Sequence, residues 1–92
     1  MVANYYEFNN QEYYALIVTS SLEKAYEFYL NDVGGDSLEQ IKEEGALDVL
    51  NPIDALIKYG LAEDNRDRSF KEVFNEFKGV TNGLLLIDGS LV

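Results

Sequence analysis

Residues 12–35, EYYALIVTSSLEKAYEFYLNDVGG, decide the fold because a strand pattern changes there directly into a helix pattern. Residues 12–19 alternate so that Tyr14, Leu16 and Val18 share one face of a strand and Tyr13, Ala15 and Ile17 share the other. Both faces are apolar, which is typical of a central strand or of one whose second face is covered by a partner. The residues after Ser20 place apolar side chains at helical spacing until Gly34-Gly35.

The helix that follows this strand begins with a Ser-x-x-Glu pattern, Ser20 to Glu23, which predicts a capping box. On the other side of the strand, Asn9-Asn10-Gln11 predicts a turn back to a strand over residues 4–8. The N-terminal segment is therefore predicted to be a β-hairpin followed by a helix.

Three further helices are predicted from their start and stop signals. One runs from Asp36-Ser37 to Gly45, with Ala46 and Leu47 as possible additions to its apolar face. Another starts at Asn51-Pro52, with Asn as the cap and Pro at the first helical position. The last runs from Ser69 to Gly79.

The chain then turns at Asn82-Gly83 into an apolar strand over residues 84–87, which could continue after Asp88-Gly89. This strand is expected to pair with residues 13–18. We predict one α+β domain over residues 1–92, with an N-terminal hairpin, four short helices and a C-terminal strand. The resulting three-stranded sheet is packed with helices.

The residue types that are missing exclude several kinds of chemistry. The 92 residues contain no Cys and no His, which excludes disulfides, thiolate and imidazole metal sites and a Ser-His-acid triad. A catalytic carboxylate pair needs a deep cleft, which a core of this size is not expected to provide. We therefore predict a protein that is not an enzyme and that has no cofactor or metal site.

The acidic residues carry the most functional information. Seventeen acids and seven bases give a net charge of -10, which opposes binding to nucleic acid and to anionic lipid. One interpretation is that the charge keeps the protein soluble. The other is a negative surface that docks on a basic protein partner. The candidate docking residues are Asp36, Glu39, Glu43 and Glu44, with Glu63, Asp64 and Asp67 as a second group.

In its small size, its acidity and its lack of Cys, the whole chain resembles small acidic inhibitor proteins encoded by phages. Anti-CRISPR proteins, the uracil-DNA glycosylase inhibitor and anti-restriction DNA mimics belong to that class. The resemblance implies an inhibitor, encoded by a phage or prophage, that binds a host nucleic-acid-handling or defence protein.

The alternative is a prophage structural or assembly module that forms a homodimer through its sheet, at a face made by Tyr13, Ala15 and Ile17. The N-terminal residues lack a signal-peptide pattern, and no apolar run reaches the roughly 20 residues that span a bilayer. We therefore predict a cytoplasmic location in a bacterial host and no membrane partner.

Overall fold

The computed structural model describes residues 3–11, 13–35, 37–62 and 65–87. The helices and strands follow one another in an order that confirms the predicted hairpin, the four helices and the strand near the C-terminus. In chain order they are β1 (Asn4–Phe8), β2 (Ala15–Thr19), α1 (Leu22–Asp32), α2 (Leu38–Glu44), β3 (Asp48–Leu50), α3 (Pro52–Leu61), α4 (Phe70–Gly79) and β4 (Gly83–Ile87). The proposed continuation of β4 after Asp88-Gly89 lies outside the described residues.

The sheet has four strands in the order β3-β1-β2-β4, and each pairing is antiparallel. The predicted pairing of the last strand with the second strand of the hairpin is confirmed, with Ala15 opposite Ile87 and Leu16 opposite Leu86. The prediction of three strands was wrong, because β3 adds to the free edge of β1. Three residues are too few to show the alternation that identifies a strand in a sequence.

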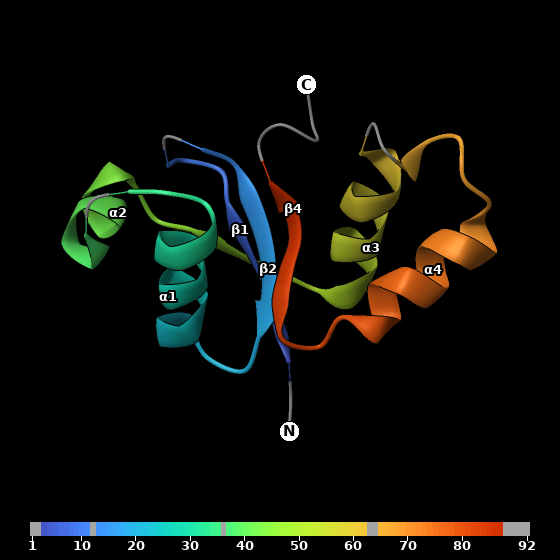
Figure 1. The fold of residues 1–92 in the computed structure, drawn as a ribbon, viewed down its shortest axis with the longest axis horizontal. Helices are drawn as coiled ribbons and strands as arrows, with labels where there is room; N and C mark the ends of the chain where they lie inside the picture. Colours follow the sequence, from blue (N-terminus) through green and yellow to red (C-terminus); the bar gives the residue numbers. More distant parts are fainter. Residues whose placement is uncertain (1–2, 12, 36, 63–64, 88–92) are drawn as a thin grey trace.

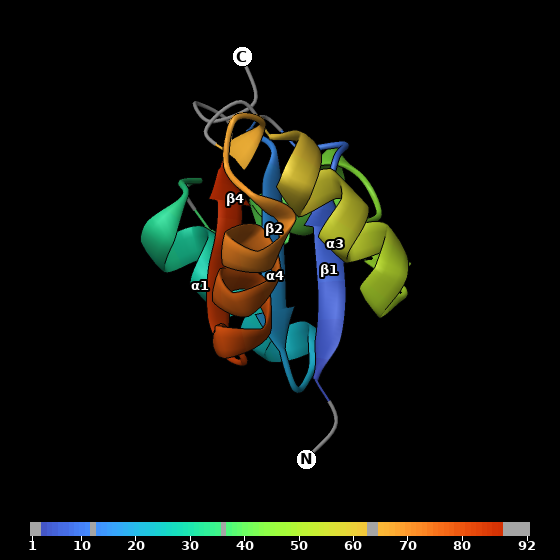
Figure 2. The ribbon, with the colours of Figure 1, turned by 90° about the vertical axis from the view of Figure 1, so that its right-hand side faces the viewer.

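The four helices form two layers, one on each side of the sheet (Figure 1). Helices α1 and α2 cover one face and helices α3 and α4 cover the other. Seen from the side of the second layer, α4 lies in front of β2 and β4, whereas α3 lies in front of β1 (Figure 2). The molecule measures 39 × 32 × 19 Å, and its longest dimension runs across the three layers (Figure 1).

Each interface between a helix layer and the sheet contains its own apolar cluster. Phe8 lies in the first cluster, beneath α1, where its ring stacks on Tyr29 with 4.7 Å between centroids. In the second cluster, Phe77 of α4 stacks on Tyr5 of β1 at 5.2 Å. The two clusters explain why β2 is apolar on both faces: Ile17 belongs to the first and Leu16 to the second. Strand β2 is therefore a central strand whose two faces are both covered by this chain.

The local start signals determine where the helices begin. Asn51 and Ser69 cap α3 and α4 as predicted, each accepting a hydrogen bond from a backbone N–H three residues later. The first helix differs by one residue, because its cap is Ser21, which accepts from the Lys24 N–H, and not Ser20. Helix α2 ends at Gly45, whose φ of +150° is unfavourable for other residues. Ala46 and Leu47 therefore lie outside that helix.

Candidate functional site

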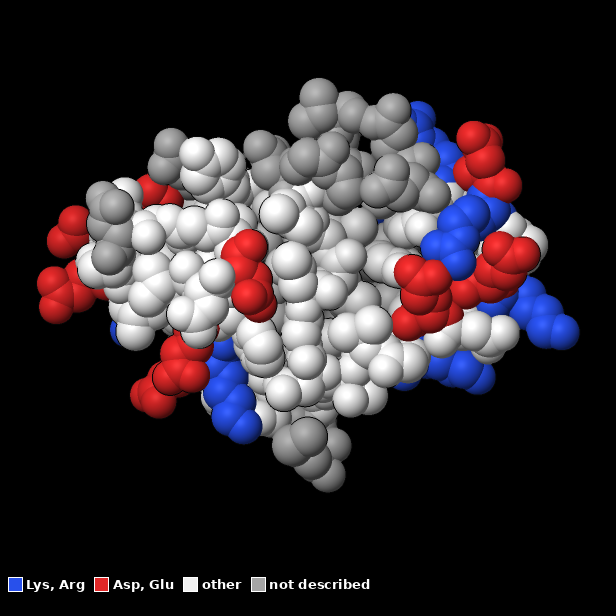
Figure 3. Space-filling model, viewed as in Figure 1, with Lys and Arg blue, Asp and Glu red and all other residues white. Residues whose placement is uncertain are grey.

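The two helix layers differ strongly in charge. The segment that contains α1 and α2, residues 22–44, has seven acids and two bases, a net charge of -5. The segment that contains α3 and α4, residues 52–79, has six acids and five bases, a net charge of -1. On the face shown in Figure 3, acidic side chains predominate over α1 and α2, whereas both signs are mixed over α3 and α4. The acidity is thus concentrated on one side of the sheet.

The predicted docking residues are divided between these layers. Glu39 and Glu43 are exposed and lie one helical turn apart on α2, and Glu44 is partly buried at the end of the same helix. Asp67 is exposed but lies in the connection between α3 and α4, on the other side of the sheet. The other three candidates, Asp36, Glu63 and Asp64, lie outside the described residues. The structure thus groups the α2 residues and separates Asp67 from them.

Three more carboxylates extend this acidic layer along α1, and the sequence prediction did not include them in the site. They are Glu23, Glu27 and Asp32, and all three are exposed. The helical spacing of Glu23 and Glu27 places them away from the buried Ala25, Tyr26 and Tyr29, and this spacing is the sequence signal that could have included them. Within the described part of the chain, none of these three, nor Glu39 or Glu43, forms an ion pair. We define the acidic face as the outer surface of the α1–α2 layer, where six acids outnumber the two exposed bases Lys24 and Lys42; the six acids are Glu23, Glu27, Asp32, Glu39, Glu43 and Glu44.

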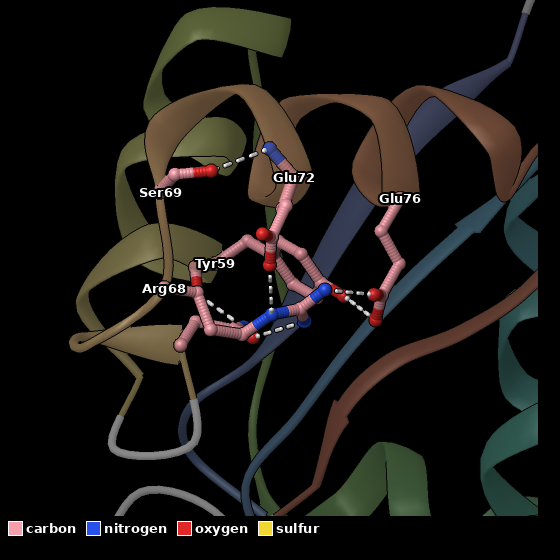
Figure 4. A network of polar contacts seen from close by, with 6 residues as sticks. Tyr59, Arg68, Ser69, Glu72 and Glu76 are labelled. Carbon is pink, nitrogen blue, oxygen red and sulfur yellow. Dashed lines mark hydrogen bonds and ion pairs between the residues drawn. The ribbon is translucent and has the colours of Figure 1, made fainter.

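The acids of α4, in contrast, are neutralised within their own layer. Arg68 donates to Glu76 at 2.6 Å and lies 3.7 Å from Glu72, while the Tyr59 hydroxyl donates to the other Glu76 oxygen at 2.7 Å (Figure 4). The hydrogen bonds from Arg68 and then Tyr59 lower the pKa of Glu76, and the carboxylate in turn raises the pKa of Arg68. Burial is the main cause that raises the pKa of Tyr59 to about 12, assisted by Glu76.

A second polar cluster is centred on Glu7, which is only 2% exposed. Its carboxylate pairs with Lys58 of α3 and accepts a hydrogen bond from the Tyr14 hydroxyl at 2.7 Å. Burial, followed by the contact with Glu7, raises the pKa of Tyr14 well above its usual range. Lys58 and Tyr14 together compensate a carboxylate that would otherwise be costly to bury.

The hollows beside these two clusters do not form a deep cleft. One, of about 290 Å³, is lined by Tyr59, Arg68 and Glu76 together with residues of β4. The other, of about 240 Å³, lies at Glu7, Tyr14 and Lys58. In each hollow the polar side chains bind one another, so the role of these contacts in stabilising the fold is enough to explain both clusters. In the described residues, no group of three or more acids, His or Cys is arranged to hold a metal ion.

The predicted dimer face is largely covered. Ala15 and Ile17 are completely buried in the cluster beneath α1, and only Tyr13, at 41%, is substantially exposed. An interface through these three residues would require α1 to leave the sheet. Most of the large exposed apolar side chains of the described residues lie elsewhere, on α3 and α4. They are Ile53, Ile57, Leu61, Phe70 and Phe74.

Comparison with known proteins places the chain in a family. Residues 3–86, which include all the strands except the last residue of β4, match the family described as the YosH C-terminal domain. The chain belongs to the YosH C-terminal domain family. It is 37% identical over 82 residues to the "SPbeta prophage-derived uncharacterized protein YosH" of Bacillus subtilis (strain 168). The matched region covers 87% of this chain and 51% of the relative, so the chain spans about half the length of that relative.

Membership of the YosH C-terminal domain family supports the expected phage or prophage origin. No solved structure matches the chain significantly. None of the helices in the described ranges is long and apolar enough to cross a bilayer.

Proposed function

We propose that this YosH C-terminal domain is a non-catalytic inhibitor that docks on a basic host protein through the acidic face. The partner class is a nucleic-acid-handling or defence protein of the bacterial host, as for anti-CRISPR proteins and DNA mimics. The observation that supports this proposal is the separation of charge: -5 over residues 22–44 and -1 over residues 52–79. A charge needed only for solubility has no requirement to be concentrated in one layer.

The geometry of the acidic face favours docking by electrostatic attraction. Glu39 and Glu43 are exposed on α2 and have no ion pair in the described part of the chain, so their charges are available to a partner. Like charges four residues apart destabilise a helix by a few tenths of a kcal/mol, a cost that the helix tolerates here. A protein groove that binds phosphates through Lys and Arg could bind these carboxylates in the same way. The attraction between the opposite charges would also accelerate association.

The experiment is quantitative capture of proteins from a bacterial lysate with the tagged chain and two variants. Glu39→Gln/Glu43→Gln removes two negative charges from the acidic face. The matched control, Asn75→Lys/Gly79→Lys, adds two positive charges at the same spacing on α4 and therefore gives the same net charge. Both control positions are exposed.

The proposal predicts that basic, nucleic-acid-binding proteins are captured at about 0.1 M salt and released at about 0.5 M, where the screening length falls to a few Å. The Glu39/Glu43 variant should lose them, whereas the α4 control should retain them. A captured set that is the same for all three proteins would contradict docking through the acidic face.

A further inference from the structure

Helix α3 carries a row of aliphatic side chains on the side that faces away from the sheet. Ile53, Ile57 and Leu61 recur every four residues and are 71%, 53% and 67% exposed. The buried residues of the same helix are Ala55 and Tyr59, with Ala62 immediately after its end. At 3.6 residues per turn, the exposed row is centred about half a turn away from the buried one. Helix α3 is therefore apolar on two opposite sides.

Helix α4 adds two aromatic rings to the exposed apolar surface of this layer. Phe70 is 71% exposed, Phe74 is 38% exposed, and the rings stack with 5.7 Å between centroids. Large apolar side chains each present about 150–250 Å², so the exposed fractions of Ile53, Ile57 and Leu61 on α3 alone amount to roughly 300 Å². That value reaches the lower end of the range of about 300–600 Å² for the largest apolar patch of a monomer, and such patches often mark interaction sites.

We propose that the outer face of α3 binds a second copy of this chain, so that two copies form a symmetric dimer. Charge is the first argument for this occupant. Asp54 and Lys58 are the charged residues of α3, which gives the helix no net charge within a chain of net charge -10. Lys58 also pairs with Glu7 of β1, and Glu7, Asp54 and Lys58 together carry a charge of only -1.

The shape of the molecule keeps the acidic faces of two such copies apart. The acidic face lies on the opposite side of the sheet, and the three layers are stacked along the 39 Å dimension (Figure 1). The screening length at physiological salt is about 8 Å. Two copies that meet at α3 therefore place their most acidic surfaces at the far ends of the dimer, where mutual repulsion is weak.

The spacing of the row is the second argument, because it is symmetric about its middle residue. A two-fold axis at Ile57 places Ile57 against its counterpart and brings Ile53 of each copy towards Leu61 of the other. Rows at four-residue spacing are the ridges that pack into grooves between helices, and a two-fold interface uses the same patch on both copies. The apolar surface of roughly 300 Å² on the α3 row would form the centre of an interface that typically buries about 800 Å² per partner.

The test is sedimentation equilibrium of the purified chain from about 1 to 300 μM. The dimer should appear as twice the chain mass of 10.4 kDa. Ile57→Glu should raise the dimer dissociation constant by at least about 10-fold, because it places two carboxylates at the centre of the interface. The uncharged variant Ile53→Ala/Leu61→Ala should also weaken the dimer.

Leu22→Glu is the matched control, because Leu22 is an apolar residue of α1 with a similar exposure of 47%. It should leave the dimer intact, as should Glu39→Gln/Glu43→Gln, which separates this inference from docking through the acidic face. Raising the salt from about 0.1 M to 0.5 M should strengthen the dimer. A wild-type chain that remains monomeric at 300 μM in both salts would overturn the inference, as would equal effects of Ile57→Glu and Leu22→Glu.

Discussion

Glu7 on β1 and Lys58 on α3 form an ion pair that joins the sheet to the helix layer above it. The Glu7 side chain is 2% exposed, whereas the Lys58 side chain is 45% exposed. The two residues are 51 positions apart in the chain. The lysine thus reaches from the surface to pair with a carboxylate that is almost entirely shielded from water.

Removing this lysine should destabilise the fold considerably. Lys58→Met leaves a buried carboxylate without its counter-ion and is expected to lower the free energy of unfolding by about 2–4 kcal/mol. The double variant Glu7→Gln/Lys58→Met should recover most of that loss, because no uncompensated charge remains. Urea unfolding of the wild type, both single variants and the double variant measures the coupling. Equal losses in Lys58→Met and in the double variant would contradict this role.

Two phenylalanines of α4, one buried and one exposed, should differ sharply in their contribution to stability. Phe77 is 4% exposed and stacks on Tyr5, so Phe77→Ala should cost about 3–5 kcal/mol. Phe70 is 71% exposed, and Phe70→Ala should cost less than about 1 kcal/mol in the monomer. Thermal unfolding at low protein concentration compares the two. Similar losses of stability for Phe77→Ala and Phe70→Ala would contradict the packing of α4 described above.

The Glu76 network should make stability depend on pH at the acidic end. The folded-state pKa of Glu76 lies below its unfolded value, so its contribution is present above about pH 4.5 and is lost as the pH falls through the folded pKa. Glu76→Gln should therefore reduce the gap in melting temperature between pH 7 and pH 3. The control is Glu72→Gln, which removes only the longer contact to Arg68. An identical pH dependence in Glu76→Gln and the wild type would argue against the network.

Tyr59 gives the opposite dependence at the alkaline end. Its folded-state pKa is raised to about 12, so the stability that it contributes is present below pH 10 and is lost as the pH rises towards 12. Tyr59→Phe should remove this part of the alkaline loss while lowering the stability at pH 7. Denaturant unfolding at pH 8 and pH 11 measures the difference. If the free energy of unfolding falls by as much between pH 8 and pH 11 in Tyr59→Phe as in the wild type, this role of Tyr59 is contradicted.

Gly45 and Gly79 form a pair of glycines for which opposite effects are expected. At Gly45, φ is +150° and an added Cβ would lie 2.6 Å from Cβ of Asn10, so Gly45→Ala should destabilise by about 1–3 kcal/mol. At Gly79, the last residue of α4, an added Cβ meets nothing within 4 Å. Gly79→Ala should be neutral or stabilising by up to about 1 kcal/mol. Melting temperatures that shift in the same direction for both would contradict this distinction.

The sequence predicted the parts of the fold that depend on local chemistry. Asn51-Pro52 and Ser69 capped the expected helices, because a cap is a contact between residues three positions apart. Strand β3 was missed because Asp48, Val49 and Leu50 are too few to show an alternating pattern. Only their pairing with β1 identifies them as a strand. The apolar residues on both sides of β2 left two interpretations open, and only the three-dimensional arrangement showed that α1 covers Ala15 and Ile17.

The same distinction applies to the candidate site. The spacing of Glu39 and Glu43 predicted their common exposed face on α2, but the relation between α2 and Asp67 depends on which side of the sheet each helix takes. Charge counts along the chain did not reveal that Arg68 neutralises Glu72 and Glu76, because that depends on the path of the connection before α4.

The pairing of β4 with β2 has a consequence for how this chain folds. Ala15 and Ile87 lie opposite each other although 72 positions separate them, and the sheet cannot be completed until these distant segments meet. The hairpin of β1 and β2 and the individual helices require only local contacts. Contacts between distant segments slow folding because a long loop must close first. We therefore expect the docking of β4, together with the burial of Leu86, to belong to the late, rate-limiting part of folding.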